Sequence, residues 1–383
     1  MKEIPFNEPF LAGTELDHVG EAVAAGLRSG GPFTARCESW LADATGAERV
    51  LLSHSGTGAL EAAMILAGLG PGDEAIMPSF AYPTMATAVV RQGAVPVFVD
   101  IDPGTLNLDP RQVATALGPR TKAIVAVHYG GVGCEMDLLL ETAAARDLIV
   151  IEDAAHCLLA TYHERPLGTL GSLGTFSFHH TKNVISGEGG ALLVNDPKLL
   201  ERAEIVWEKG TDRMRFERNE VDRYTWVDIG SSFAASELTA AFLWGQLEVA
   251  EEITRRRLAI WQRYHEAFAE LEAEGLAQRP EVPAGHTHNG HLYYLTLPSA
   301  PARDAFIAAM RAQGIATSFH YVPLHSSPAG RRFGRAVGDL AQTEQLSQRL
   351  VRLPLWAGLD SRAVERVIDA ARSAAGDVAG SRT

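Results

Sequence analysis

The stretch Leu148-Ile-Val-Ile-Glu-Asp-Ala-Ala-His156 gives the clearest indication of the fold. Its apolar start, Leu148 to Ile151, predicts a strand covered on both faces, because apolar residues follow one another without alternation. Strands that alternate with helices predict crossover units and a mostly parallel sheet, which is an α/β fold. The preceding segments follow this pattern, with predicted strands at 74–77, 95–99 and 123–127 and predicted helices at 58–69 and 137–147.

The pattern changes toward both ends of the chain. Thr14 is placed to cap a helix that reaches about Leu27, with Asp17 as an imperfect capping-box partner. We expect a large domain over residues 14–248, a smaller α+β domain over 249–383 and an N-terminal arm, 1–13. The remaining predicted elements are strands at 175–178 and 191–194, one long helix over 236–274, a strand at 292–297, a helix at 302–313, a strand near Ala316 and a helix at 361–374.

Composition excludes several classes of protein. Of 383 residues, 46% are apolar and 21% charged, which is enough apolar material for a large core and argues against disorder. The net charge of -13, without a local basic patch, gives no attraction to nucleic acid. No apolar run reaches the roughly 18 residues of a membrane span, and the first residues lack a secretion signal. Cys37, Cys134 and Cys157 fit neither a disulfide framework nor a zinc site, so we expect a cytoplasmic protein.

Two short segments are suited to hold an anion and a cation. Ser53-His-Ser-Gly-Thr-Gly58 precedes a helix, where hydroxyls and free helix amides can hold a phosphate. A tight turn with a helix cap is the alternative. Asp153 ends the buried strand, and a carboxylate there needs a cationic partner such as a protonated pyridine nitrogen. The alternative for Asp153 is a helix cap.

A lysine follows at the end of an aromatic strand, in Phe176-Ser-Phe-His-His-Thr-Lys-Asn183. Lys182, among apolar and cationic neighbours, can have a lowered pKa and form a Schiff base, although a lone lysine is more often exposed. His179 and His180 point to opposite sides if the segment is extended, which argues against a metal site. A phosphate-binding turn, a strand-end aspartate and a lysine together meet the requirements of pyridoxal 5'-phosphate (PLP).

Two further segments are rich in histidine. Phe319-His-Tyr-Val-Pro-Leu-His325 offers two imidazoles and a phenol at a predicted bend. The second segment has His286, His288 and His291 in a loop rich in glycine and asparagine. Cysteine or acidic ligands are missing near both segments, so no zinc site is expected, and the histidines of the second segment are interpreted as structural.

Ordered segments along nearly the whole chain resemble the DegT/DnrJ/EryC1/StrS sugar aminotransferases, which have the type I, aspartate-aminotransferase-like fold of PLP enzymes. Within that family, residues 133–137, 208–211, 224–232 and 319–321 are similar to the dTDP-4-amino-4,6-dideoxyhexose transaminases. The segments that carry the family resemblance are Ile4–Asn7, Ser55–Thr57, Pro71–Asp73, Phe98–Asp100, His128–Gly130, Glu152–Ala155, Phe176–Ser177–Phe178 with Lys182, Gly187–Gly190 and Pro323–His325.

The resemblance implies a role for each matched residue. Lys182 would form the Schiff base with PLP and then move the proton, and Asp153 would pair with the pyridinium nitrogen. His156 would lie near the phenolic oxygen of the cofactor. The other implied positions are Gly56, Thr57 and Ser177 at the phosphate, Tyr82 stacked on the ring, and His320, Tyr321, His325 and Lys209 near the sugar nucleotide.

One segment departs from the family pattern. Many members have Gly-Phe-Asn-Tyr-Arg where this chain has Gly230-Ser-Ser-Phe-Ala234. The family's asparagine reaches the phosphate of the neighbouring subunit, and Ser232 takes its place here and can still donate one hydrogen bond. The resemblance thus implies a homodimer with shared active sites. From the charge and the apolar runs we expect no nucleic-acid or membrane partner.

The reaction implied by the resemblance is transamination from glutamate to C4 of a dTDP-4-oxo-6-deoxyhexose, which yields dTDP-4-amino-4,6-dideoxyhexose and 2-oxoglutarate. Such a product serves an antibiotic sugar or a surface polysaccharide. One alternative is amination at C3 of a dTDP-3-oxo sugar. Another is the activity of the related dehydratases, which have histidine in place of the lysine and so disagree with Lys182. A third is a regulator that binds PLP or a nucleotide sugar without turnover.

Overall fold

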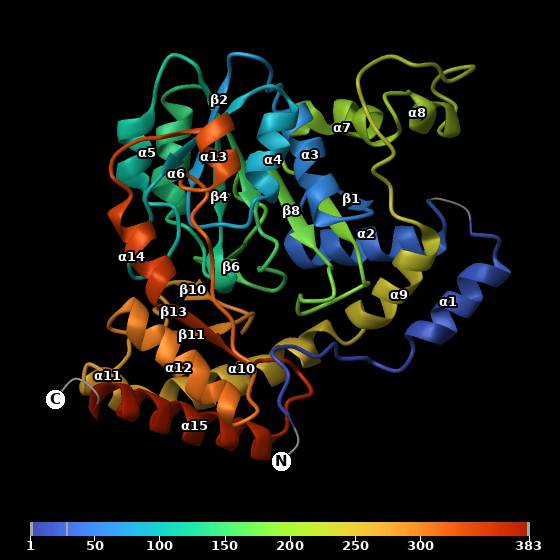
Figure 1. Ribbon diagram of the computed structural model, residues 1–383. Coiled ribbons are helices and arrows are strands. Elements are labelled where there is room, and N and C mark those ends of the chain that lie inside the picture. The colour runs from blue at the N-terminus through green and yellow to red at the C-terminus, as the bar shows by residue number, and fades with distance from the viewer. Residues whose placement is uncertain (1–2, 28–29, 381–383) are drawn as a thin grey trace.

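The computed structural model describes residues 3–27 and 30–380, so the first two residues of the predicted arm lie outside the described part (Figure 1). None of the helices in these ranges is long and apolar enough to cross a membrane. An eight-stranded sheet consists of β1 (Arg49–Ser53), β2 (Glu74–Pro78), β3 (Val95–Val99), β4 (Thr121–Val127), β5 (Ile149–Asp153), β8 (Leu173–Ser177), β9 (Gly190–Val194) and β12 (Arg335–Ala336).

The strand order in this sheet is β1-β9-β8-β5-β4-β2-β3-β12. Strand β9 is antiparallel to both of its neighbours, whereas the pairs from β8 to β12 are parallel. The predicted α/β class with a mostly parallel sheet is therefore confirmed. Parallel order places the carboxyl ends of β4, β5 and β8 at one edge of the sheet, where open α/β sheets hold their ligands.

Helices cover both faces of the sheet, which explains why its strands read as continuous apolar runs. On β4, Ile124 and Ala126 pack in one hydrophobic cluster, and Ala123 and Val125 pack in another, because successive side chains of a strand point to opposite faces. The first cluster includes α2 (Pro32–Thr45), α5 (Pro110–Ala116), α6 (Met136–Ala144) and α9 (Glu237–Leu247), and the second includes α3 (Gly56–Leu66), α4 (Thr84–Arg91) and α7 (Leu200–Trp207).

A third hydrophobic cluster lies in the C-terminal part of the chain, and Ile4 of the arm packs into it. However, β12 pairs with β3, and Ile253 packs with the large sheet, so the C-terminal sequence contributes to both parts. The domain division after residue 248 remains a prediction. The third cluster is built by α10 (Ala250–Ala267), α11 (Ala269–Ala273), α12 (Ala300–Ala312) and α15 (Ser361–Gly380) around β11 (Tyr293–Thr296) and β13 (Leu350–Leu353).

Shorter elements connect these layers. They are α1 (Glu15–Ala24), a 3-10 turn η1 (Tyr129–Gly131), β6 (Thr161–Tyr162), β7 (Arg165–Pro166), η2 (Pro197–Leu199), α8 (Arg213–Glu217), β10 (His286–Thr287), α13 (Pro328–Phe333) and α14 (Ala341–Arg349). Thr14 does precede α1 as predicted, but its side chain makes no capping bond. The carboxylate of Glu15 instead accepts hydrogen bonds from the amides of Ala12 and Gly13.

Besides the Thr14 cap, two sequence predictions are wrong, one for a helix and one for a strand. The long helix over 236–274 is three helices, because Val249 and Phe268 leave the helical conformation. No strand forms near Ala316, where neighbouring residues make only isolated bridges. The segment of His179 and His180 is not extended, so the condition under which the two side chains would point apart is not met. The amides of Phe178 and His180 donate to carbonyls of the following glycine loop, and the two imidazole rings are 4.0 Å apart.

Candidate active site

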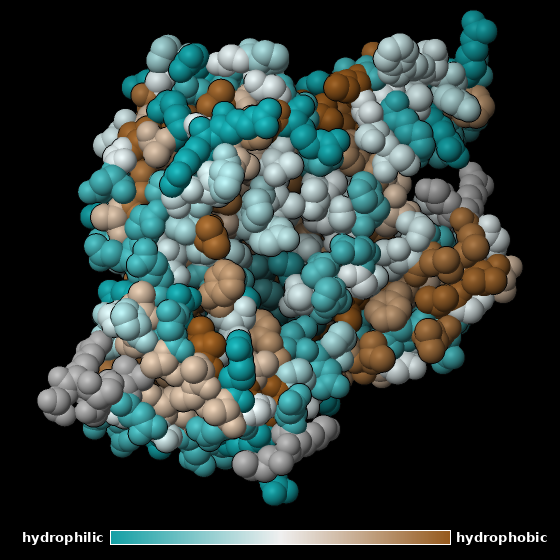
Figure 2. All heavy atoms as spheres, in the orientation of Figure 1, coloured by the Kyte–Doolittle hydropathy of each residue, from teal (hydrophilic) through white to brown (hydrophobic). Residues whose placement is uncertain are grey.

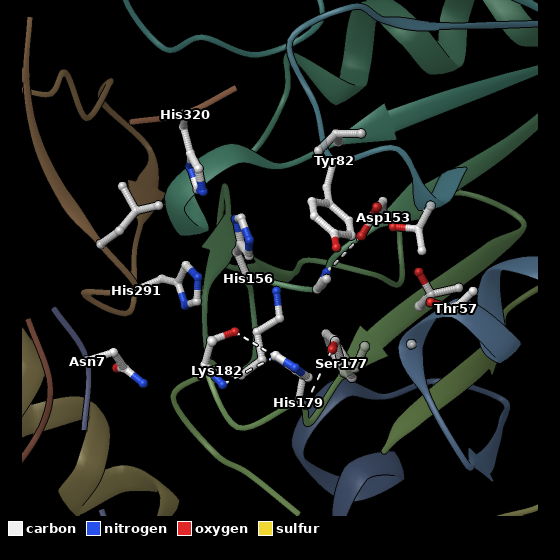
Figure 3. A pocket seen from close by; sticks show the side chains of 18 of the residues that line it. Asn7, Thr57, Tyr82, Asp153, His156, Ser177, His179, Lys182, His291 and His320 are labelled. Atoms are coloured by element: carbon white, nitrogen blue, oxygen red, sulfur yellow. Dashed lines mark hydrogen bonds between the residues drawn. The ribbon is translucent and has the colours of Figure 1, made fainter. Parts of the chain in front are cut away.

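A cavity of about 510 Å³ opens at the carboxyl ends of β4, β5 and β8 and at the start of α3. Figure 3 shows Thr57 and Ser177 on one side of it, Asn7 and His291 on the other, and Lys182 between them. The cavity brings together most of the residues predicted from the sequence, namely Gly56, Thr57, Tyr82, Asp153, His156, Ser177, Lys182, His320 and Tyr321.

The start of α3 forms an anion site on one wall of the cavity. Ser55 caps the helix, since its hydroxyl accepts a hydrogen bond of 3.0 Å from the amide of Gly58. The amides of Gly56 and Thr57 have no acceptor within the helix, so they are available to a phosphate. A Cβ at Gly56 would lie 2.8 Å from Cβ of Ser177, so glycine allows the helix to approach that hydroxyl closely.

Asp153 stands at the end of β5, and its Oδ1 accepts a hydrogen bond of 3.2 Å from the amide of Ala155. Burial raises the pKa of Asp153, and the charges of Lys182 and His128 oppose this rise. A desolvated carboxylate is stabilised as an anion when a cationic group lies beside it. The site thus suits a protonated ring nitrogen. The alternative role of Asp153, as a helix cap, does not explain why its side chain lines the cavity.

Glu152 fixes the end of β5 from the other face of the sheet. Its fully buried carboxylate accepts hydrogen bonds from the amides of Gly168, Leu170 and Gly171, at 2.6–2.8 Å. Nε2 of His128, at the end of β4, lies 2.8 Å from the same carboxylate. Since successive residues of a strand point to opposite faces, this network holds the strand while its last side chain faces the cavity.

Lys182 follows β8 in a tight loop, where its amide donates to the carbonyl of His179 at 2.9 Å. Its side chain enters the cavity rather than solvent, as Figure 3 shows, so the alternative of an exposed lysine is wrong. Burial lowers the pKa of Lys182 to about 8, although the negative charge of Asp153 acts in the opposite direction. An amine with such a pKa is a better nucleophile near neutral pH than an ordinary lysine.

Two imidazoles stack next to the lysine. The rings of His156 and His291 are 4.0 Å apart and nearly parallel, and burial lowers the pKa of both. The amide of Gly130 donates to Nδ1 of His156 at 3.3 Å, and Nδ1 of His291 lies 2.9 Å from Oδ1 of Asn183. His291 was interpreted as purely structural, but it lines the cavity.

The other two histidines of that segment lie elsewhere. His286 packs edge-on against Tyr162 at 5.0 Å, and His288 packs against Trp261 at 4.3 Å. Within residues 3–27 and 30–380, no three histidine, cysteine or carboxylate side chains are grouped as metal ligands.

The opposite wall is built from segments that are far apart in the sequence. We call Phe6, Asn7, His320, Tyr321 and Arg352 the arm wall, and Gly56, Thr57, Asp153, Ser177 and Lys182 the strand wall. Within the arm wall, the rings of His320 and Tyr321 stack at 3.8 Å, and Cζ of Arg352 lies 4.6 Å from the ring centre of Phe6.

Sequence reasoning missed Phe6, Asn7 and Arg352 as cavity residues. A charged residue inside the apolar run of β13 was the one available signal for Arg352.

Three predicted site residues do not reach the cavity within this chain. Ser232 is exposed and forms a backbone bridge to Glu208, and Nζ of Lys209 lies 3.1 Å from the Glu208 carboxylate. His325 is held by Ser79 and Glu344, at 2.6 and 3.1 Å. The roles predicted for these three residues remain predictions.

The arrangement fits PLP. The free amides of α3 and the hydroxyls of Ser55 and Ser177 suit its phosphate, Asp153 suits its ring nitrogen, and the amine of Lys182 suits its aldehyde. All of these groups line one cavity. The fold and site therefore define a PLP-dependent enzyme.

Comparison with known proteins gives the family. Residues 10–372 match the DegT/DnrJ/EryC1/StrS aminotransferase family, and the chain belongs to it. The chain is 35% identical to GDP-perosamine synthase of Caulobacter vibrioides, over 94% of this chain and 95% of that one. It is 33% identical to dTDP-4-dehydro-2,3,6-trideoxy-D-glucose 4-aminotransferase of Saccharopolyspora spinosa, over 96% and 95%.

A solved structure agrees with this assignment. The aminotransferase TlmJ from Streptoalloteichus hindustanus has a TM-score of 0.90 and 33% identity, with 98% of this chain and 100% of that chain covered. The protein is thus an aminotransferase of the PLP-dependent sugar aminotransferase family with the type I fold, and the predicted family, fold, enzyme class and cofactor are confirmed.

Proposed function

We propose that this enzyme transfers the amino group of glutamate to C4 of a dTDP-4-oxo-6-deoxyhexose, which yields dTDP-4-amino-4,6-dideoxyhexose and 2-oxoglutarate. The observation that carries the proposal is that the lysine amine, the strand-end carboxylate and the helix anion site line one cavity. The Saccharopolyspora relative, named as a 4-aminotransferase of a dTDP-4-dehydro sugar, supports position C4 and the dTDP group.

When bound, PLP supplies an aldehyde that condenses with amines and a protonated ring that withdraws electrons from the reacting carbon. We assign Asp153 the task of keeping the proton on the ring nitrogen, because its own charge is stabilised by that cation. Nζ of Lys182 would take a proton from the α-carbon of the donor and later give one to C4 of the sugar. Its lowered pKa suits both directions of transfer.

His156 is assigned to the phenolic oxygen of the cofactor. A backbone amide can only donate, so Nδ1 of His156 accepts the hydrogen bond from Gly130 and the ring hydrogen is on Nε2. That N–H can donate to an oxygen in the cavity. Tyr82, which is 64% exposed and lines the cavity, is assigned to stack on the cofactor ring, and His320 and Tyr321 are assigned to the sugar nucleotide.

A homodimer with shared active sites is part of the proposal. Figure 2 shows apolar side chains gathered over α1, and Leu16 of that helix is 77% exposed. Trp226, at 79%, and Ile229, at 54%, are also exposed, close in sequence to Ser232. Apolar patches of this kind mark interfaces. Ser232 and Lys209 would then act in the partner's site, which accounts for their distance from this cavity.

The proposed reaction is tested by product analysis. The purified holoenzyme is incubated with glutamate and, separately, dTDP-4-oxo-6-deoxyglucose, its 3-oxo isomer, and the corresponding GDP-4-oxo sugar. We expect an amine at C4 of the dTDP sugar, located and assigned as axial or equatorial by NMR. An amine at C3 would support the alternative reaction. The GDP sugar is included because the chain is similar to GDP-perosamine synthase. A preference for the GDP sugar would contradict the proposed dTDP group of the substrate.

A further inference from the structure

His291 is a buried histidine for which the proposed mechanism has no task. It lies on the loop between β10 and β11 and lines the cavity. Its imidazole stacks on that of His156, with 4.0 Å between the ring centroids and 19° between the planes. Figure 3 shows the two rings side by side, near the end of the Lys182 side chain. The stack thus joins a loop of the C-terminal part to a residue that is assigned to the cofactor.

Hydrogen bonds fix both the position and the tautomer of His291. Its Nδ1 lies 2.9 Å from Oδ1 of Asn183, and Nδ2 of that asparagine donates to the carbonyl of Asn289 at 3.0 Å. The reverse orientation of the asparagine amide would set its oxygen against that carbonyl. Nδ1 of His291 therefore carries the hydrogen, and Nε2 has the lone pair. Asn183 directly follows Lys182, so the lysine loop and this imidazole are tied together.

The loop that carries His291 is held on both sides without a ligand. The buried Arg257 donates from Nε to the carbonyl of Gly290 at 3.1 Å and from Nη2 to that of His291 at 2.6 Å. On the other side, Nδ2 of Asn289 donates to the carbonyl of His156 at 2.8 Å. The same loop thus contacts His156 twice, through its main chain and through its ring.

The surroundings keep both imidazoles neutral. Burial lowers the pKa of His156 and of His291 well below the ordinary value of histidine. The charges of Lys182 and Arg352 lower both pKa values further. Because neither ring is charged at neutral pH, the two can stack face to face without charge repulsion.

We infer that His291 is a positioning residue, whose ring supports that of His156 so that Nε2 of His156 points at the phenolic oxygen of PLP. The inference rests on the place proposed for His156. Gly130 holds Nδ1 of His156 by one hydrogen bond of 3.3 Å, which sets the direction of the ring but not its tilt. Tyr129 meets the ring edge-on, at 6.2 Å between centroids. The flat face of His291 fixes the tilt, because stacked aromatic rings have a preferred geometry.

A direct contact between His291 and a substrate is the alternative, and it makes a different demand on the side chain. Such a contact needs the lone pair on Nε2, whereas the supporting role needs only the flat ring. His291→Phe keeps an aromatic face and removes both nitrogens. His291→Asn keeps a donor that can reach Asn183 and removes the ring. The two variants therefore separate the two roles.

The test follows the absorbance of the bound cofactor as a function of pH, with no substrate present. A hydrogen bond to the phenolic oxygen draws its negative charge away from the nitrogen of Lys182 that is linked to the cofactor, which lowers the pKa that the absorbance reports. We expect His156→Ala and His291→Asn to raise this pKa by about one unit. In His291→Phe it should stay within about 0.3 units of wild type.

A second readout uses the cofactor-free protein. Nitrogen NMR of the imidazoles should show His291 neutral with its hydrogen on Nδ1 and His156 neutral with its hydrogen on Nε2, each signal assigned by its loss in the variant. His163→Asn is the matched control, because His163 is exposed in the turn between β6 and β7, outside the cavity, and has a positive φ that asparagine tolerates. No change is expected there. Thermal melting of each variant shows whether the fold is kept.

The outcomes separate this inference from the proposed function. A shift of the pKa in His156→Ala without one in His291→Asn would overturn the positioning role alone. Equal shifts in His291→Asn and His291→Phe would also overturn it, because the nitrogens rather than the ring would then matter. An unchanged pKa in His156→Ala would remove the place proposed for His156 and the inference with it. If the titrations agree but the wild type aminates none of the dTDP sugars, the positioning role stands and the proposed reaction fails.

Discussion

The two walls of the cavity differ in how the chain builds them. The strand wall comes from strand ends and the turns that follow them, so each of its residues stands in a short motif. The arm wall joins the N-terminal arm, the bend around His320 and strand β13, which are more than 300 residues apart at the extremes. The contrast suggests that the strand wall carries the chemistry and the arm wall carries the recognition of substrates. The following predictions test this division.

The largest effect is expected at the lysine. Lys182→Ala removes the amine that holds the cofactor and moves the proton, and should lower turnover by about 10³-fold or more. Steady-state rates and circular dichroism measure activity and fold. Lys198→Ala, at an exposed lysine outside the cavity, is the control and should be fully active. If the turnover of Lys182→Ala were within tenfold of wild type, the strand wall would not carry the chemistry.

Asp153→Asn should come second. The amide keeps the shape of the side chain but no longer stabilises a proton on the ring nitrogen, so we expect kcat to fall by about 10²- to 10³-fold. The absorbance of the bound cofactor should change as well, because the ring loses its charge. An unchanged rate with the amide at this position would show that the ring nitrogen has another partner.

The pH dependence of cofactor binding should follow the protonation of the Lys182 amine. Since the pKa of Lys182 is about 8, the neutral amine of the cofactor-free protein reaches its plateau above that pH. The rate of reaction with PLP should therefore fall about tenfold for each pH unit below 8. Asp153→Asn removes a charge that raises this pKa, so the midpoint should move lower. A rate that keeps rising to pH 10 would indicate an ordinary exposed lysine.

Gly56→Ala should have the smallest effect of the four. The added methyl group would meet Cβ of Ser177 at 2.8 Å, so the start of α3 must move away, and we expect PLP to bind about 10-fold more weakly. Gly376→Ala is the control, because Gly376 lies in α15, outside the cavity, with nothing within 4 Å of a new Cβ. Equilibrium titration with PLP measures both. Equal affinity in Gly56→Ala and wild type would contradict the close approach.

The same contrast explains what the sequence could reveal. Asp153, Lys182 and the turn at Gly56 were predicted because strand ends and helix starts are local features with recognisable residues. Arg352 and Phe6 were missed because their neighbours come from distant segments, and only the folded chain places them together. The sequence interpretation of His291 as structural is incomplete, because the sequence of a loop does not indicate which side chain a histidine in it will stack against.

The errors in the predicted helices and strands also arise from contacts between distant segments. The helical pattern over 236–274 continues through Val249, but the backbone leaves the helical conformation there, and α10 then passes from the cluster of the large sheet, at Ile253, into the third cluster, at Ile260. The strand near Ala316 has β-forming residues but only isolated partners. The sheet itself was predicted well, because its strands are buried on both faces and flanked by turns.

The most direct test of the central claim is to locate the covalent link between the holoenzyme and its cofactor. Borohydride reduction followed by peptide mass analysis should place a pyridoxyl group on the peptide that contains Lys182, and on that peptide alone. The mark should be absent in Lys182→Ala. A pyridoxyl group on another lysine, such as the exposed Lys209, or none at all in an active holoenzyme, would contradict the account.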